Sequence, residues 1–462
     1  MTGKRVIGIE TEYGITCAST TGDVPPIEPE EAAQRLFQRV LEMSKSTNTF
    51  LPNGARLYLD VGAHPEYASA ECDQIDDLLA NDRAGDELYA QMAASANEKL
   101  AKQGIPGRIH LFKNNVDSEG NSFGCHENYL VRRRRDFRAR IDSLIPFFVT
   151  RQILVGAGHL RKDADGSVSY EISQRAEQMW DAVSSASTRS RPMINTRDEP
   201  HGDAELYRRM HVIVGDSNMS EPTTALKVGT TEALLNVIED GVWMPNFALA
   251  DPTHAIRQVS LDLTGKAEVA LASGETTTAL DIQRRVFDLV HGHYEKTGWL
   301  ADLDPTRRYV FDLWERTLTA LETGATDAVA TEIDWIAKKR LLERYVDRLG
   351  TDWSDPRIAR LDLAWHDITD KGLRANLEAT GGLRTVLAPE AIQRATGIPP
   401  QTTRAKLRGD FVAAAMDHRR DYMVDWMNLR LLTDGGANSL ILKDPFVAAD
   451  ARVDALIEQM ES

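Results

Sequence analysis

The segment 6–16 has a two-residue period along its whole length, which predicts a β-strand. One face would carry Ile7, Ile9, Thr11, Tyr13 and Ile15, and the other would carry Val6, Gly8, Glu10, Glu12 and Gly14. Two residues span about 7 Å of strand, so Glu10 and Glu12 would place two carboxylates on one face. Such carboxylates repel each other unless a cation lies between them, although a solvated edge strand with acidic outer residues also fits.

A second segment with the same period follows at 56–61. One face would carry Arg56, Tyr58 and Asp60, and Glu66 follows after a turn predicted at HPE. An arginine can bind a phosphate through forked hydrogen bonds, and Mg²⁺ takes a few protein oxygens while phosphates fill its other positions. The two segments together favour a site for a metal-bound phosphate. A polar outer face with a local Arg–Asp ion pair is the alternative.

The remaining pattern mixes short strands with helices and lacks regular βαβ spacing, which predicts an α+β fold on a mainly antiparallel sheet. Further strands are predicted at 108–113, 126–132 and 210–216, and helices from Pro29, over 73–103 and through most of 277–350. A boundary is expected near the GIPP segment at 397–400. It would divide a large domain, 1–395, from a small C-terminal domain, 396–462, docked on it.

Composition narrows the class of protein. The chain has 462 residues and a formal net charge of −16, which argues against extensive nucleic-acid binding. Its three cysteines cannot form a disulfide framework and indicate a reducing compartment. The N-terminus lacks the apolar run of a signal peptide, and Arg151 and Gln152 interrupt the most apolar stretch, so we expect a cytoplasmic protein without a membrane span. P-loop and dinucleotide-binding motifs are absent, so an ATP site would need a different cradle.

Longer blocks of sequence resemble the Pup ligase family over nearly the whole chain. They are GIETEYG at 8–14, NGARLYLDVGAHPEYASAEC at 53–72, LFKNN at 111–115, GCHENYL at 124–130, STRSRPMINTRDEPH at 187–201, HVIVGDSNM at 211–219, EIDW at 332–335, PPQTTRAKLRGDF at 399–411 and VDWMNL at 424–429. The resemblance implies a large glutamine synthetase-like domain, whose curved, mainly antiparallel sheet holds Mg-ATP on its concave face, and a small C-terminal domain.

The resemblance also implies a reaction and its partners. Enzymes of this family use ATP and Mg²⁺ to phosphorylate the side-chain carboxylate of the C-terminal glutamate of Pup, a small disordered protein. A lysine amine of a target protein then attacks the γ-glutamyl phosphate, and an isopeptide bond forms. The tagged protein can be degraded by a bacterial proteasome. We therefore expect Pup and lysine-bearing target proteins as partners, and neither nucleic acid nor a membrane.

Site residues carry over from the family by motif. Three match its magnesium contacts, Glu10, Tyr58 and Glu66, and three match its ATP contacts, Arg56, Ser69 and Trp426. Ser69 stands where many relatives have a threonine, and both residues offer a hydroxyl. Asp60 matches the proton acceptor. It would remove a proton from the attacking lysine or would mainly orient the amine, and both roles stay open here.

Other residues have weaker grounds. Glu12 and His211 face the right way to be additional metal or phosphate contacts. The run Cys125-His126-Glu127 resembles a metal cluster only superficially, because adjacent strand residues point to opposite faces, and zinc is not expected. Arg132–Arg135 is the densest basic run and receives no role. Better candidates for holding phosphates or the Pup terminus are Arg189, Arg191, Arg197, Arg208 and Arg209.

The nearest alternative is the Pup deamidase/depupylase of the same family. That enzyme typically has GTEVEYG in its first strand and a long insertion between the first helix and the second strand. This chain has GIETEYG, and only residues 44–53 separate those elements. A non-catalytic family member is the other alternative, and it would be expected to lack Glu10, Asp60 or Glu66, all of which are present.

Overall fold

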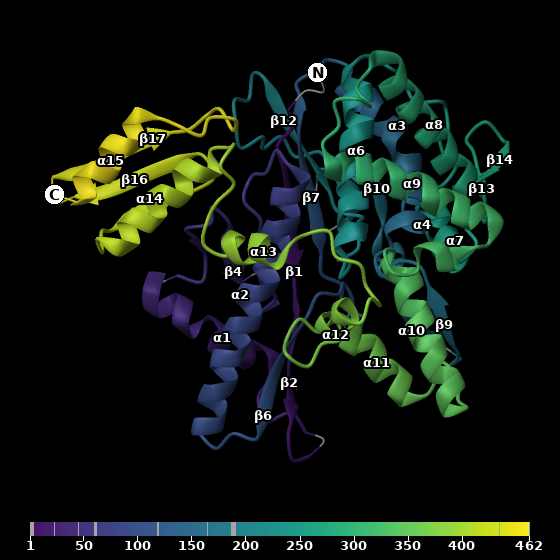
Figure 1. The fold of residues 1–462 in the computed structure, drawn as a ribbon, viewed down its shortest axis with the longest axis horizontal. Coiled ribbons are helices and arrows are strands. Elements are labelled where there is room, and N and C mark those ends of the chain that lie inside the picture. The colour runs from purple at the N-terminus through teal and green to yellow at the C-terminus, as the bar shows by residue number, and fades with distance from the viewer. Residues whose placement is uncertain are drawn as a thin grey trace.

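The computed structural model describes residues 4–461 apart from 23, 45, 60–61, 118–119, 164, 186–190 and 434. Its main sheet has eight strands in the order β10-β11-β12-β7-β1-β5-β4-β3 (Figure 1). Their bounds are Asp181–Ser184, Pro192–Asn195, Tyr207–Val212, Cys125–Arg132, Ile7–Glu12, Pro65–Ala68, Arg56–Leu59 and Thr49–Phe50. All neighbours pair antiparallel except β10 and β11, which confirms the α+β prediction with a mainly antiparallel sheet.

Strand β1 lies inside this sheet, between β5 and β7, and its burial alternates as predicted. Ile7 and Ile9 belong to the largest hydrophobic cluster, together with residues of helices α2 (Ile75–Lys102) and α6 (Glu221–Glu239). Helix α2 contacts β1, and α6 contacts β7. Glu10 and Glu12 therefore lie on the face opposite to this core.

The prediction of one strand over 6–16 is wrong at Tyr13. Strand β1 ends at Glu12, and β2 (Gly14–Ser19) pairs with β6 (Gly107–Phe112) in a separate two-stranded sheet. Tyr13 is fully buried, its hydroxyl donates to Asp86 at 2.7 Å, and its backbone N–H donates to Pro65 at 2.8 Å. The buried side chain and these two bonds fix the chain where it leaves one sheet for the other.

Two other strand predictions need correction. The strand predicted at 210–216 is β12, which begins at Tyr207 and ends at Val212. The turn predicted at HPE is wrong at Pro65 and Glu66, because these residues begin strand β5 (Pro65–Ala68), a strand of 4 residues that was not predicted. Proline fits the first position of a strand, where it takes no donor from the ladder.

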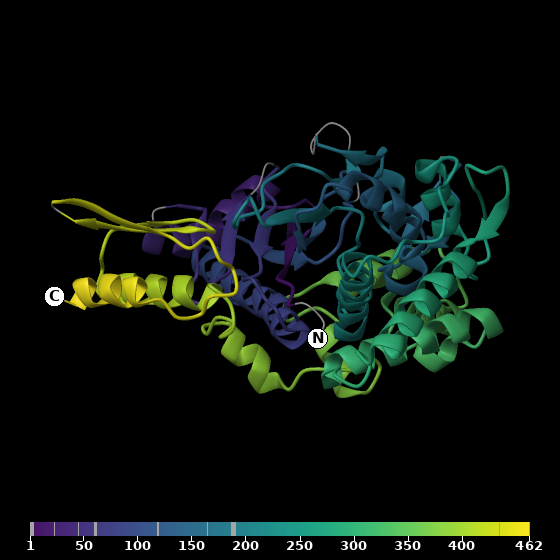
Figure 2. The same ribbon diagram turned by 90° about the horizontal axis from the view of Figure 1, so that it is seen from above.

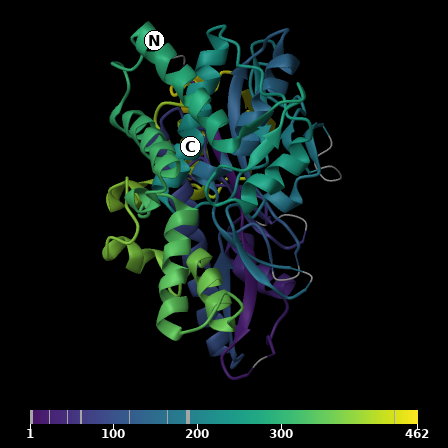
Figure 3. The same cartoon turned by 90° about the vertical axis from the view of Figure 1, so that its right-hand side faces the viewer.

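Helices fill most of the remaining chain. They are α1 (Pro29–Ser44), α3 (Phe137–Thr150), α4 (Gln152–Val155), α7 (Pro252–Leu261), α8 (Ala279–Thr297), α9 (Pro305–Thr323), α10 (Asp334–Leu349), α11 (Pro356–His366), α12 (Arg374–Ala379) and α13 (Pro389–Ala395). Two short hairpins, β8–β9 (His159–Lys162 and Val168–Glu171) and β13–β14 (Glu268–Ala270 and Thr276–Thr278), join them. Helices α8 to α11 gather on the side facing the viewer in Figure 3. None of the helices among the described residues combines the length and apolarity that crossing a membrane requires.

The C-terminal residues form a smaller layered unit at the left of Figure 2. It comprises α14 (Ala405–Asp417), a sheet of β15 (Tyr422–Val424), β16 (Asn428–Thr433) and β17 (Gly436–Ile441), and α15 (Ala451–Glu461). This unit has its own hydrophobic cluster, which Phe50 of β3 joins from the main sheet. The domain division at 395/396 stays a prediction.

Replacing Gly85 by alanine should destabilise the fold, although alanine favours helices. A Cβ at this position of α2 would lie 2.5 Å from the ring of Tyr67 on β5, and both residues are buried. We expect Gly85→Ala to lose about 1–3 kcal/mol of unfolding free energy, measured by urea denaturation. The matched control is Gly292→Ala in α8, where nothing lies within 4 Å of the added Cβ.

That control should be neutral or should gain up to about 1 kcal/mol from helix propensity alone. Equal effects of the two substitutions would contradict the close packing of α2 against β5.

Candidate active site

The sheet register brings the predicted carboxylates to one face. Glu66 of β5 lies opposite Glu12 of β1 on one side and opposite Tyr58 of β4 on the other. Opposite residues of an antiparallel pair have Cβ atoms about 4.5–5.5 Å apart. One row of the sheet therefore carries two carboxylates and a phenol.

The next row carries Glu10 and Arg56, which both lie opposite Ala68 of β5. The guanidinium of Arg56 lies 4.9 Å from the ring centroid of Tyr58, and its Nε donates to Asn48 Oδ1 at 2.7 Å. Four of the residues predicted from sequence, Glu10, Arg56, Tyr58 and Glu66, thus lie together on three neighbouring strands. Asp60, the predicted proton acceptor, lies outside the described residues.

Tyr58 is held as a neutral phenol. Its hydroxyl donates a hydrogen bond to the Glu66 carboxylate. Burial, together with the negative charges of Glu10 and Glu66, raises the pKa of Tyr58 well above its usual range. Tyr58 can therefore offer its oxygen lone pairs to a cation without adding a charge of its own.

Two histidines complete the acidic face. One ligand atom each of Glu10, His126 and His211 lies within 4.8 Å of the other two, and His126 Nδ1 is 3.4 Å from Glu10 Oε2. Burial lowers the pKa of His211 to about 3, which keeps its imidazole neutral. A neutral imidazole and an ionised carboxylate are the forms that bind divalent metals.

Glu10 is ionised in this setting. Burial alone would raise its pKa, but the hydrogen bond with His126 and the nearby guanidinium of Arg209 hold it well below its usual range. Arg209 Nη1 is 3.8 Å from Glu10 Oε1, and Asn128 Nδ2 donates to the same oxygen at 3.2 Å. The carboxylate is thus fixed in place and charged.

Sequence reasoning missed His126 as a site residue, although the signal was present. Cys125 and Glu127 point into the core, as neighbours on a strand must when His126 points to the opposite face. The central residue of the triplet lies beside Glu10 and His211. The same alternation that selected Glu10 would have selected His126.

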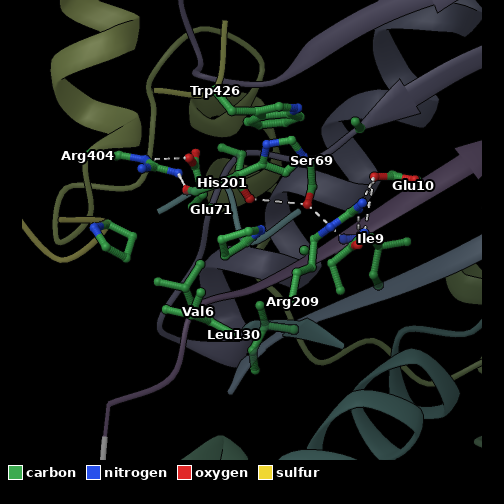
Figure 4. Close-up of a pocket in the computed structure, with 17 residues that line it drawn as sticks. Val6, Ile9, Glu10, Ser69, Glu71, Leu130, His201, Arg209, Arg404 and Trp426 are labelled. Atoms are coloured by element: carbon green, nitrogen blue, oxygen red, sulfur yellow. Dashed lines mark hydrogen bonds and ion pairs between the residues drawn. The ribbon is translucent and has the colours of Figure 1, made fainter. Parts of the chain in front are cut away.

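A pocket that opens to solvent adjoins this face (Figure 4). Its lining comes from β1, β5, β7, β12, the segment at 200–201 and the C-terminal unit, and includes Val6, Ile9, Glu10, Ser69, Glu71, Leu130, His201, Arg209, Arg404 and Trp426. An apolar end formed by Val6 and Leu130 therefore leads to a charged end at Glu10.

Ser69 and Trp426, two predicted ATP contacts, both line the pocket. The Ser69 hydroxyl accepts from the Ile9 N–H at 2.9 Å and donates to the Ala70 carbonyl at 3.1 Å. The Trp426 ring packs edge-on to Phe50, with centroids 5.0 Å apart. Trp426 belongs to the C-terminal unit, so the pocket has walls from both parts of the chain.

The predicted basic residues divide into two groups. Arg209 lines the pocket, whereas Arg191 donates to Gln178, Arg197 pairs with Glu199, and Arg208 pairs with Asp198. Arg189 lies outside the described residues. In the basic run, Arg133 forms a bidentate pair with Asp198 and Arg134 pairs with Asp136, so these side chains serve local structure.

Comparison with known proteins identifies the family. The family described as "Pup-ligase protein" matches residues 5–430. The Pup–protein ligase of Sanguibacter keddieii is 52% identical over 461 residues, covering 100% of both chains. The Pup–protein ligase of Xylanimonas cellulosilytica is 53% identical over 459 residues, covering 99% of this chain and 100% of the relative.

Solved structures agree with this result. The complex between the prokaryotic ubiquitin-like protein Pup and its ligase PafA matches 99% of this chain and 91% of its own, with a TM-score of 0.92 and 43% identity. The Pup ligase PafA in complex with ADP matches 94% of each chain, with a TM-score of 0.84 and 45% identity. This chain therefore belongs to the Pup-ligase family.

Proposed function

We propose that this chain is an ATP-dependent Pup–protein ligase, which acts in the cytoplasm and joins the side chain of the C-terminal glutamate of Pup to lysines of target proteins. One observation carries the proposal. In a chain matched over its whole length by Pup–protein ligases, three neighbouring strands bring Glu10, Tyr58 and Glu66 to the face beside a pocket lined by Ser69 and Trp426. The two similar ligase structures are a complex with Pup and a complex with ADP.

The pocket is the proposed nucleotide site. Its apolar end suits a base, Trp426 offers an aromatic face, and Ser69 directly follows strand β5, which carries Glu66. Arg56 and Arg209 supply positive charge on either side of Glu10 for the phosphates.

The acidic face suits magnesium. Glu10, Glu12 and Glu66 present hard oxygen donors from two adjacent strands, and the Tyr58 oxygen lies beside Glu66. We propose Glu10, Tyr58 and Glu66 as the residues that hold Mg²⁺, with His211 and Glu12 as further contacts. When bound, the metal would offset the negative charge of the nucleotide phosphates and of the attacking carboxylate.

The reaction then runs in two steps. A γ-carboxylate oxygen of the Pup glutamate attacks the γ-phosphorus of ATP, the bond to the β-phosphate oxygen breaks, and ADP leaves. The positive charges of Arg56 and Arg209 favour this approach of two anions. A lysine amine of the target next attacks the resulting acyl phosphate carbon, phosphate leaves, and an isopeptide bond remains.

The second step requires a neutral amine. A free lysine has a pKa of about 10.4 and is almost fully protonated near neutral pH. We propose Asp60 as the group that accepts the proton as the amine attacks or that orients the amine for attack. If Asp60 accepts the proton, replacing it should abolish the acylation of lysine but leave the phosphorylation of Pup intact.

Intact-mass spectrometry tests the reaction itself. The mixture contains this protein, Mg-ATP, a lysine-bearing test protein and Pup ending in glutamate. We expect a new species at the summed mass of Pup and test protein less one water, with one ADP formed per conjugate. Asp60→Asn should form no conjugate, because the amine loses its carboxylate partner.

Pup ending in glutamine is the matched control substrate and separates the ligase from its deamidase sister. A gain of one dalton in that peptide, with no conjugate from the glutamate form, would assign the chain to the deamidase. The short connection between α1, which ends at Ser44, and β3, which begins at Thr49, favours the ligase. If neither a conjugate nor the one-dalton gain is observed, the chain is neither a Pup ligase nor a Pup deamidase.

The metal assignment predicts a shift in magnesium dependence. Glu10→Gln keeps the shape of the side chain but removes one of the charges facing a cation. We expect the Mg²⁺ concentration for half-maximal ADP formation to rise on the order of tenfold, with partial recovery at high Mg²⁺. The control is Glu315→Gln, an exposed position on α9, which should leave the magnesium curve unchanged. An unchanged curve for Glu10→Gln would remove Glu10 from the metal site.

A further inference from the structure

One buried carboxylate connects two walls of the pocket. Glu71 follows strand β5 and lies between two arginines of the C-terminal unit, Arg404 and Arg408, which are 1% and 0% exposed. Arg404 Nε donates to Glu71 Oε1 at 2.9 Å, and Arg408 donates to both carboxylate oxygens. Burial alone would raise the pKa of Glu71, but the charges of Arg408 and Arg404 lower it to about 2.

Arg408 extends from this carboxylate to Trp426. Its Nη1 donates to the Trp426 carbonyl at 3.2 Å, and its guanidinium lies 4.9 Å from a Trp426 ring centroid. On its other side the same guanidinium lies 5.1 Å from the Phe50 ring and donates to the Gly54 carbonyl at 2.8 Å. Gly54 precedes β4, so Arg408 fixes Trp426 relative to the strand that carries Arg56 and Tyr58.

Arg404 extends from the carboxylate to His201, which also lines the pocket. Its Nη2 donates to the carbonyl of His201, whose ring lies 6.2 Å from the Trp426 ring (Figure 4). The backbone of His201 has a φ of 47°, an uncommon value for a residue other than glycine. A hydrogen bond to its carbonyl helps to hold this conformation. Arg404 also donates to the Leu442 carbonyl at 2.8 Å, within the C-terminal unit.

We infer that Glu71, Arg404 and Arg408 are positioning residues for nucleotide binding, which act by fixing two residues that line the pocket, Trp426 and His201. The inference rests on the proposed nucleotide site. It gives a role to the PPQTTRAKLRGDF segment, which contains both arginines and has no residue among the predicted contacts.

The chemistry of the cluster explains why these residue types are needed. Two guanidiniums around one carboxylate leave a net positive charge that must be shared through carbonyl oxygens, and each arginine donates to carbonyls on a different segment. A lysine would keep the charge but could not reach Glu71, Gly54 and Trp426 at once, because it lacks the planar fork. Arg408→Lys should therefore hold Trp426 less firmly in place while it keeps the positive charge of the cluster.

A double-mutant cycle on ADP affinity tests this inference. The variants are Arg408→Lys, Trp426→Ala and the two combined, with ADP binding measured by titration calorimetry. We expect each single substitution to weaken ADP binding on the order of tenfold, and the double variant to be nearly as weak as Trp426→Ala alone. Independent effects would instead multiply to about a hundredfold.

Kinetics and rescue give a second measurement. Glu71→Gln should raise KM for ATP by about tenfold with less change in kcat and in KM for Pup, because Glu71 pairs with Arg404 and Arg408 and not with the residues proposed to hold the metal. Glu71→Asp, which retains the charge, should recover most of the ATP affinity. Circular dichroism melts of each variant establish that the protein is folded at the assay temperature.

The control breaks a similar ion pair away from the pocket. Glu232 of α6 binds Arg307 of α9 through two contacts of 2.8 and 2.9 Å. Glu232→Gln should lower the melting temperature and leave ADP affinity unchanged. Weakened ADP binding in this control would mean that general destabilisation explains the Glu71 result.

Each outcome has a separate meaning. Unchanged ADP affinity in Trp426→Ala would overturn the proposed nucleotide site itself. Weakened binding in Trp426→Ala, with wild-type affinity in folded Arg408→Lys and Glu71→Gln, would overturn the positioning inference alone. Additive losses in the cycle would also overturn it, because Arg408 would then not act through Trp426.

Discussion

The opposed demands on the two faces of strand β1 are the constraint on which the structure depends. Ile7 and Ile9 must be buried against α2 and α6, while Glu10 and Glu12, one and three residues after Ile9, face the other side of the sheet. A strand in the sheet interior has no edge at which to escape this alternation, so a shift of one residue would bury both carboxylates in the core. The hydrophobic core therefore sets the register that creates the acidic face.

Charge on the two sides of the sheet is balanced in different ways. On the core side, Glu127 of β7 forms a bidentate pair with Arg151 at 2.6 and 2.8 Å, with both side chains buried. On the opposite side, Glu10 has one guanidinium at 3.8 Å and two imidazoles nearby. The first carboxylate is neutralised within the protein, because an unpaired buried charge would be strongly destabilising. The second remains available to a cation from solution.

Sequence patterns predicted the parts of this arrangement that depend on local geometry. The alternation alone placed Glu10 and Glu12 on one face of a strand. It also placed Arg56 and Tyr58 together on the polar face of another strand. It could not place those strands in one sheet, because β5, which lies between β1 and β4, was not predicted. Trp426 was predicted only through family resemblance. Nothing in its local pattern distinguishes a pocket residue from the core of a small domain.

Similar limits apply to the buried charges. Glu71, Arg404 and Arg408 look like ordinary surface residues in sequence, since acidic and basic side chains are seldom fully buried. Their burial follows from the docking of the C-terminal unit on β3 and β4, which no local pattern records. His126 was within reach of the alternation rule and was missed because it was considered only as part of a triplet.

The residues that line the pocket are synthesised at widely separated times. Its floor is made of residues 6–10 and 68–71, but Arg404 and Trp426 are synthesised only after about 400 residues of the chain. During translation the N-terminal region can build its sheet and core while the pocket still lacks a wall, because domains generally form as units from the N-terminus onward. If the pocket is the proposed nucleotide site, a nascent chain acquires nucleotide binding late. An incomplete product, however well its sheet has folded, would carry the carboxylates without the pocket wall that Arg404 and Trp426 supply.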